Sequence, residues 1–156
     1  MEFELSSLII TIIAFLAFVI PVSIDQLTKK KKAQTVKILT QFAERQKVKL
    51  SKKEVFQNIY AFGLDNSLKE LIYVNNGNAG TVESYTLSNY SKCSQHKESI
   101  KSSDSKFTGV TYLRLTPKNS SQPQVDLEMF KTKANLANTE EEGIAKKLIK
   151  AVNQVL

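Results

Sequence analysis

Residues 60–76 read YAFGLDNSLKELIYVNN, and this stretch decides the fold because two extended segments stand on either side of a polar turn. Both segments are rich in aromatic and aliphatic residues, and Asn66–Ser67 separates them, which is typical of a β-hairpin. In the second segment, apolar side chains occur at both odd and even positions between Leu68 and Val74. Since neighbouring side chains of a strand point to opposite faces, we expect this strand to be covered on both sides.

Extended regions continue toward the C-terminus. NNGNAG at 75–80 is the strongest turn signal in the chain. The region after it becomes polar beyond Tyr90, whereas the next two regions alternate more regularly. The three regions are 81–100, 107–117 and 125–130, and polar loops at 100–106 and 118–124 separate them. These lengths and spacings predict an antiparallel meander.

The last element is predicted to be an amphipathic helix at 139–156. Thr139 and Glu142 have the spacing of a capping box, and Glu140 and Glu141 suit the positive end of the helix dipole. The apolar residues of this helix form one stripe, made of Ile144, Leu148, Ile149, Val152, Val155 and Leu156. Such a stripe needs a surface to cover, and the open face of the sheet is the available one. We therefore expect an α+β fold, in which an antiparallel sheet or partly open barrel is closed by this helix.

The residues just before the hairpin leave two structures open. Ser51 and Glu54 have capping-box spacing and precede Val55 and Phe56, which favours a short helix. The same stretch, 51–60, is also compatible with a strand that leads directly into the hairpin.

The positive charge is concentrated near the N-terminus. The 156 residues carry 22 basic and 15 acidic side chains, a net charge of +7. Residues 29–53 hold ten basic residues and one acidic residue, a net charge of +9, whereas 54–156 are almost neutral at +1. The excess of positive charge therefore belongs to one short segment. The chain has no extended basic face of the kind that would indicate nucleic-acid binding.

That basic segment, 29–53, is predicted to be a helical connector, because Val36, Leu39 and Phe42 recur at three-residue intervals. Five of its lysines are candidate contacts with anionic lipid head groups: Lys29, Lys30, Lys31, Lys32 and Lys37. The simpler interpretation, which we favour, is that they orient the chain in a membrane and form a solvated stalk.

Residues 5–24, LSSLIITIIAFLAFVIPVSI, contain no charged side chain. Twenty helical residues cover about 30 Å, the hydrocarbon thickness of a bilayer, which predicts one transmembrane helix. A cleaved signal peptide is the alternative, but the chain starts with acidic residues and the apolar run is longer than signal peptides have. The lysines that follow predict a single pass through the inner (plasma) membrane, with the N-terminus outside and the C-terminal domain in the cytoplasm.

These patterns divide the chain into three parts. Residues 1–28 are the N-terminal tail and the span, 29–53 are the juxtamembrane connector, and 54–156 are the β domain with its terminal helix.

FGLDNSLKELIYV, YTLSNYSKC, VTYLRL and VDLEMF follow one another before the final helix. This order, over residues 61–156, resembles the pleckstrin-homology-like (PH-like) domains of bacterial membrane-anchored proteins. The resemblance implies a bent, partly open β-barrel capped at one end by the helix, and a binding or scaffolding module without catalytic residues. The chain departs from the seven-strand pattern of the family, because five strands are identifiable. Phosphoinositide binding is not implied, since Lys69 is the one basic residue between the first two strands.

The residues that carry chemistry are few and do not converge. Cys93 and His96 are the one thiol and the one imidazole of the chain, whereas a zinc site needs four ligands. Residues three apart on a strand point to opposite faces, which also argues against a Cys–His nucleophile pair. Residues 140–142 spread around a helix, and 77–80 lack the Lys-Ser/Thr of a phosphate loop. We expect no catalytic residue, no metal ligand and no cofactor.

These observations support the hypothesis of a protein that is not an enzyme, whose cytoplasmic β domain binds a protein or a lipid at the inner membrane face. The expected partners are anionic lipid head groups near residues 29–32 and a protein that the sequence does not identify, and no nucleic acid is expected. The alternative is an accessory subunit of a membrane-associated enzyme complex whose catalytic residues come from another chain.

Overall fold

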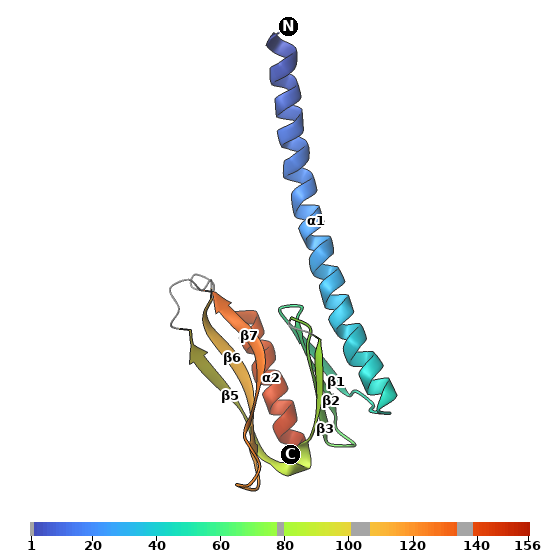
Figure 1. Ribbon diagram of the computed structural model, residues 1–156, viewed down its shortest axis with the longest axis vertical. Helices are drawn as coiled ribbons and strands as arrows, with labels where there is room; N and C mark the ends of the chain where they lie inside the picture. Colours follow the sequence, from blue (N-terminus) through green and yellow to red (C-terminus); the bar gives the residue numbers. More distant parts are fainter. Residues whose placement is uncertain (1, 78–79, 101–106, 134–138) are drawn as a thin grey trace.

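The described residues form seven strands and two α-helices (Figure 1). The computed structural model describes residues 2–77, 80–100, 107–133 and 139–156, with the backbone alone for 2–8, 14–25 and 107. The helices are α1 (Glu2–Arg45) and α2 (Thr139–Val155), and the short 3₁₀ helix η1 (Leu87–Asn89) joins two strands. The strands are β1 (Lys52–Phe56), β2 (Tyr60–Asp65), β3 (Glu70–Asn75), β4 (Thr81–Thr86), β5 (Tyr90–Ser99), β6 (Phe107–Pro117) and β7 (Val125–Lys133). Together they make an α+β fold with two antiparallel sheets.

The N-terminal helix requires a correction to the sequence-based prediction. Within the part of the chain that the structure describes, no helix is both long enough and apolar enough to cross a membrane. This finding contradicts the span predicted at 5–24. It also contradicts the single-pass topology and the inner-membrane location, with a cytoplasmic C-terminal domain, that depended on that span.

Sheet A contains β1, β2, β3 and β4 in chain order, each antiparallel to the next. All residues of β2 and the four central residues of β3 are buried. Phe62 on β2 lies opposite Tyr73 on β3, and both belong to the core between the two sheets. Their neighbours Ala61 and Val74 belong to a second core under α1. The cover expected on both faces of β3 is confirmed, and sheet A is the middle layer of the molecule.

The C-terminal part of α1 covers the outer face of sheet A (Figure 1). Leu39 and Ala43 are buried there against Ala61, Ile72 and Val74. These residues and the buried Val48 form one cluster, which we call the outer core.

A Schellman motif ends α1 and turns the chain back toward sheet A. The N–H of Lys47 donates to the carbonyl of Glu44 at 3.1 Å, and the N–H of Val48 donates to the carbonyl of Ala43 at 2.8 Å. Lys47 has a φ of 57°, in the left-handed region that glycine usually occupies at this position. Val48 and Ala43 are both buried in the outer core, which provides the apolar contact that accompanies the motif.

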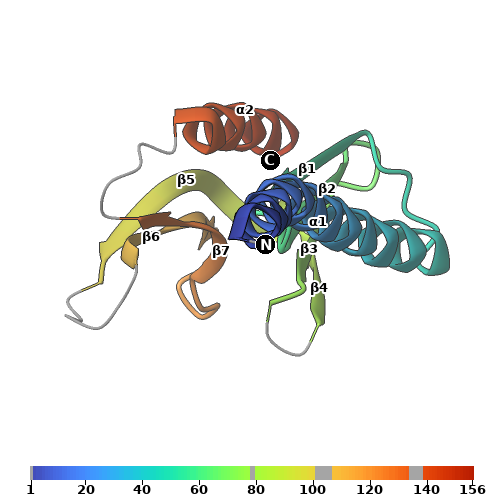
Figure 2. The ribbon, with the colours of Figure 1, turned by 90° about the horizontal axis from the view of Figure 1, so that it is seen from above.

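Sheet B contains β5, β6 and β7 in chain order. It faces sheet A across the core that lies between the two sheets, which we call the inner core. α2 lies across one side of the space between the sheets (Figure 2). Its buried residues Ala145, Leu148 and Val152 belong to the same core as Leu113 and Met129 of sheet B. The apolar stripe of α2 therefore has the role that the sequence predicts, because both sheets offer it an apolar surface.

Two segments of the structure differ from the single meander that the sequence predicts. The strand region expected at 81–100 is two strands in different sheets, because η1 interrupts it and its fully buried Leu87 anchors the turn. Residues 52–56, where helix and strand were both open, form β1, and Phe56 lies opposite Tyr60 of β2. The strand count is thus higher than the five that the sequence pattern identifies. Of the expected loops, 101–106 and the turn residues 78–79 lie outside the described residues.

Gly63 of β2 allows α1 to approach sheet A closely, which leads to the first prediction. A Cβ at this position would stand 2.7 Å from Cδ2 of Leu50 and 3.0 Å from Cδ1 of Leu39. We expect Gly63→Ala to lower the free energy of unfolding by about 1 kcal/mol or more, because Leu39 is fully buried and has little room to move. Gly143→Ala is the matched control: a Cβ on Gly143 meets nothing within 4 Å, and alanine in a helix is worth about 0.5–1 kcal/mol over glycine. Urea unfolding of both variants measures the two effects, and equal changes at the two positions would contradict this account.

Asp65 ends β2 and organises the turn to β3. Its Oδ1 accepts hydrogen bonds from the N–H groups of Ser67 and Leu68 at 2.7 and 3.1 Å, and its Oδ2 accepts one from the N–H of Lys49 at 2.8 Å. Burial alone would raise the pKa of Asp65. The hydrogen bonds, with the Ser67 hydroxyl foremost, favour the charged form and hold this pKa below its usual range.

A second prediction concerns acid stability. Because the pKa of Asp65 is depressed in the folded state, its contribution is present above the ordinary value of 3.8 and is lost as the pH falls through and below it. We expect Asp65→Asn to be less stable than the wild type at neutral pH, and the gap to close below about pH 4, by at most about 1.4 kcal/mol per pH unit. Urea unfolding at a series of pH values measures the gap. A gap that stays constant down to about pH 2 would show that the carboxylate charge is not what stabilises the turn.

Candidate functional site

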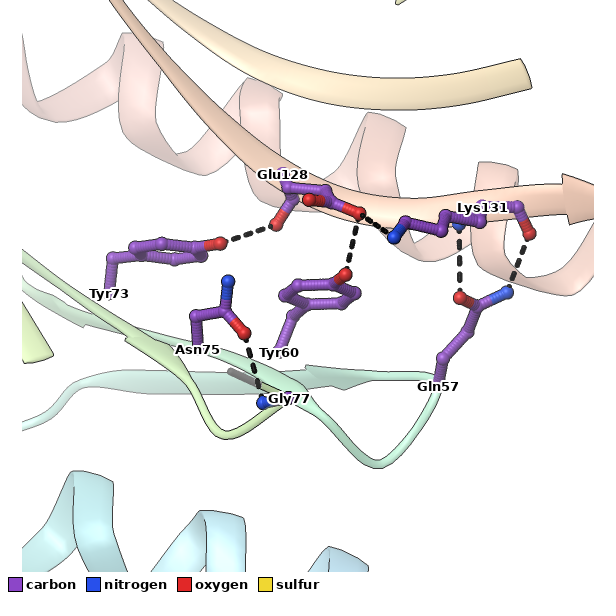
Figure 3. A network of polar contacts seen from close by, with 7 residues as sticks. All are labelled: Gln57, Tyr60, Tyr73, Asn75, Gly77, Glu128 and Lys131. Carbon is purple, nitrogen blue, oxygen red and sulfur yellow. Dashed lines mark hydrogen bonds and ion pairs between the residues drawn. The ribbon is translucent and has the colours of Figure 1, made fainter. Parts of the chain in front are cut away.

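Five polar residues join sheet A to sheet B at the edge of β7, and we call them the sheet clamp (Figure 3). Its members are Gln57, Tyr60, Tyr73, Glu128 and Lys131. The Tyr60 hydroxyl donates to Oε1 of Glu128 at 2.5 Å, and Nζ of Lys131 lies 3.3 Å from the same oxygen. The Tyr73 hydroxyl donates to the main-chain carbonyl of Glu128 at 3.1 Å. One residue of β7 therefore receives hydrogen bonds from both central strands of sheet A.

The two phenols of the clamp, Tyr60 and Tyr73, are held in the protonated state, in which they donate hydrogen bonds. Burial and the Glu128 carboxylate raise the pKa of Tyr60 well above its ordinary value of 10.0. The pKa of Tyr73 is raised in the same direction, by burial first and by Glu128 second. Phenols with raised pKa values stay protonated at neutral pH and donate hydrogen bonds, whereas a general base needs a pKa near the working pH. The geometry thus favours a link between layers over proton transfer.

Within the clamp, the side-chain amide of Gln57 bonds to the main chain of β7 as a neighbouring strand would. Its Nε2 donates to the carbonyl of Lys131 at 2.7 Å, and its Oε1 accepts from the N–H of Lys131 at 3.0 Å. Gln57 and Asn58 have φ values of 47° and 59° and are the central residues of a β-turn between β1 and β2, with the Ile59 N–H bonded to the Phe56 carbonyl at 3.1 Å. These angles are those of a type I′ turn, which suits the twist of a hairpin.

The same turn is bonded to α1 on its other side. Thr35 is fully buried, and its hydroxyl lies 2.7 Å from the carbonyl oxygen of Asn58 and 3.0 Å from that of Lys31. The Asn76 side-chain amide donates to the Thr35 hydroxyl at 3.1 Å. The β1–β2 turn therefore connects α1, sheet A and sheet B at one place.

A pocket opens at the opposite end of sheet A, where the last turns of α2 pass over β1 and β2. We call it the α2 pocket; its volume is about 390 Å³, and it is lined by Ser51, Lys52, Leu64, Asn66, Lys69, Ala151, Gln154 and Val155. Leu64, Ala151 and Val155 supply apolar surface, while the other residues supply amides, a hydroxyl and two ammonium groups. Nζ of Lys52 donates to the carbonyl of Lys147 at 3.3 Å and lies 3.7 Å from Oε1 of Glu54, whereas Lys69 is exposed. The lining of the pocket thus combines apolar, positively charged and hydrogen-bonding groups.

The five lysines expected to contact lipid head groups all lie on exposed positions of α1: Lys29, Lys30, Lys31, Lys32 and Lys37. Lys31 also lines a second pocket of about 290 Å³, together with Gln34, Asn58 and Asn76. The structure thus brings Lys31 next to the β1–β2 turn, whereas the other four lysines line neither pocket.

The residues weighed for catalysis are placed as follows. Cys93 is buried on β5, and burial raises the pKa of its thiol to about 12, so the thiol is protonated and unreactive at neutral pH. His96 lies opposite Tyr112 of β6, with the ring centres 6.2 Å apart. Glu142 forms an ion pair with Lys97 of β5 at 2.6 Å. Among the described residues, no three His, Cys, Asp or Glu side chains lie close enough to hold a metal ion.

Comparison with known proteins adds no relative: no protein-family model, no curated protein and no solved structure matches this chain.

Sequence reasoning did not identify the sheet clamp or the α2 pocket. Tyr60 and Glu128 are 68 residues apart, and Gln57 and Lys131 are 74 apart, so no local pattern links them. The α2 pocket joins residues 51–69 to residues 151–155, which are still farther apart along the chain. One local signal existed for Gln57–Asn58, since a polar pair between apolar extended residues is typical of a tight hairpin turn.

The clamp leads to a third prediction. Tyr60→Phe removes the hydroxyl that bonds to Glu128, and a hydrogen bond to a charged group is worth about 1.5–3 kcal/mol. We expect the free energy of unfolding to fall by about that amount. Tyr90→Phe on β5 is the control, since burial is the one cause of the raised pKa of Tyr90, and we expect a much smaller change there. Denaturant unfolding followed by circular dichroism measures both, and an equally small effect at Tyr60 would refute the clamp.

Proposed function

We propose that the chain is a non-catalytic protein-binding module with a PH-like architecture. The support for the architecture is the arrangement of the strands, four in sheet A and three in sheet B, followed by a helix that closes one side. The resemblance implies a bent, partly open barrel of seven strands capped by a helix, and the seven strands and the final helix support the proposal. The inner-membrane part of the earlier hypothesis is not retained, because the span on which it depended is contradicted.

The observation that carries the binding proposal is the α2 pocket. Its apolar residues can receive a partner's aliphatic side chain, and Lys69 can pair with a carboxylate. The expected ligand is therefore a protein segment that presents an apolar residue next to an acidic one. The sheet clamp and Cys93 support a non-catalytic role, since their phenols and thiol are held in the protonated state.

The fourth prediction tests this proposal by photo-crosslinking. A photoreactive amino acid replaces Gln154, an exposed residue of the α2 pocket, in the full chain expressed in its own cells. The matched control carries the same group at Gln122, which is exposed in the loop between β6 and β7. We expect one discrete crosslinked protein from position 154 and none from position 122.

A charge-reversal variant checks the chemistry of the contact. Lys69→Glu should reduce the crosslink at position 154 by on the order of tenfold, the change for a loss of about 1.4 kcal/mol. Lys118→Glu, on an exposed loop, should leave it unchanged. Equal crosslinking from positions 154 and 122, or no effect of Lys69→Glu, would overturn the proposal. An enzyme among the crosslinked partners, inactive without this chain, would instead favour the accessory-subunit alternative.

A further inference from the structure

At each edge of sheet B, a side-chain amide bonds to the main chain of one residue as a neighbouring strand would. At the β7 edge, Gln57 exchanges two hydrogen bonds with the main chain of Lys131. At the β5 edge, Asn153 of α2 accepts from the N–H of Cys93 at 2.9 Å and donates to its carbonyl at 2.8 Å. These amides come from the β1–β2 turn and from α2, and covering an edge with a loop or a helix is one way in which native sheets avoid unwanted association.

The two edges of sheet A differ from each other. β1 carries Lys52, Lys53 and Glu54, and it also contacts both helices. Charged residues and covering elements protect an edge strand. β4 reads TVESYT, with Glu83 as its one charged residue and no proline. Figure 2 shows β4 at the margin of sheet A farthest from α2. Within the described part of the chain, β4 has a neighbouring strand on one side alone.

The phase of the ladder shows which main-chain groups of β4 point outward. The N–H of Leu87 donates to the carbonyl of Lys69 at 2.7 Å. These two residues continue the β3–β4 register by one position, because Glu70 stands opposite Thr86. Hydrogen-bonded pairs alternate along an antiparallel ladder. The odd-numbered residues of β4 therefore bond to β3, and the outward N–H and C=O groups belong to Val82, Ser84 and Thr86.

We propose that β4 pairs antiparallel with β4 of a second copy of this chain, around a two-fold axis at Ser84. A two-fold axis perpendicular to the sheet requires one residue to stand opposite itself. With Ser84 at the axis, Val82 stands opposite Thr86 of the second copy. The outward residues then form three pairs, each exchanging two hydrogen bonds, and all of them lie within β4.

The side chains favour the same register. With Ser84 at the axis, Glu83 faces Tyr85 of the second copy, and the phenol of Tyr85 already bonds to Glu83 within its own chain. An axis at Glu83 would instead place two carboxylates directly opposite each other, which destabilises a pair of strands. A second copy is therefore a better occupant than an arbitrary peptide, because β4 complements itself in both hydrogen bonding and charge.

The fifth prediction uses disulfide formation in the full chain to test this pairing. Ser84→Cys places two cysteines opposite each other with their Cα atoms about 5.5 Å apart, a separation that a disulfide can bridge. Native Cys93 does not interfere, because it is buried and burial raises its pKa to about 12. We expect a disulfide dimer to form with oxidised glutathione at least about tenfold faster than for Ser120→Cys on the exposed loop, because pairing raises the local thiol concentration.

The register has its own readout. Val82→Cys and Thr86→Cys should each form homodimers slowly, whereas a mixture of the two should form the mixed disulfide quickly. Ser84→Lys should shift the unmodified chain toward monomer in sedimentation analysis, with Ser120→Lys as the control of equal charge. Because α1 exposes isoleucines at 9, 10, 12 and 13, the position-specific disulfides separate a β4 contact from a helix contact.

A disulfide rate at position 84 no higher than at position 120 overturns the pairing, and so does a fast Val82→Cys homodimer, which places the axis elsewhere. Either failure leaves the α2 pocket proposal standing, because crosslinking from position 154 is measured independently of β4. A crosslink of Ser84 to a different protein would also overturn pairing with a second copy.

Discussion

The burial of sheet A on both faces is the constraint on which the rest of the structure depends. Its inner face contributes Phe62 and Tyr73 to the core shared with sheet B and α2, and its outer face contributes Ile72 and Val74 to the contact with α1. A sheet with two apolar faces needs a cover on each. The long N-terminal helix and the C-terminal half of the chain therefore pack against the same four strands, and the position of each depends on that sheet.

Hydrogen bonds between polar groups fix how these layers are placed relative to one another. Thr35 fixes α1 to the β1–β2 turn, and Gln57 fixes the same turn to β7, so one hairpin end sets the relation of three layers. The clamp around Glu128 holds the sheets together at one side, while the α2 pocket remains open at the other end of sheet A. The residues that join the layers are thus separated in space from the residues that line the pocket.

Much of the local structure follows from the sequence. The hairpin at 60–76, the later strands and the stripe of α2 are all indicated by periodicity, because half-buried strands and helices place apolar residues at fixed intervals. The predicted membrane span was wrong, because no helix among the described residues is long and apolar enough to cross a membrane, and the division of 81–100 was missed. Leu87 explains the second error: one buried leucine redirects the chain between sheets, and nothing in its neighbours distinguishes it from a strand residue.

The sequence by itself determined the hairpin at 60–76, the strands after residue 107, the C-terminal helix and which strand needs two covers, because these properties depend on residues close together in the chain. The tertiary structure alone decided that seven strands divide into two sheets, that Tyr60 meets Glu128, and that residues 51–69 and 151–155 enclose a pocket. Such contacts join residues roughly 70 to 100 positions apart. Their partners are selected by the packing of whole layers, and a single chain carries no local mark of that choice.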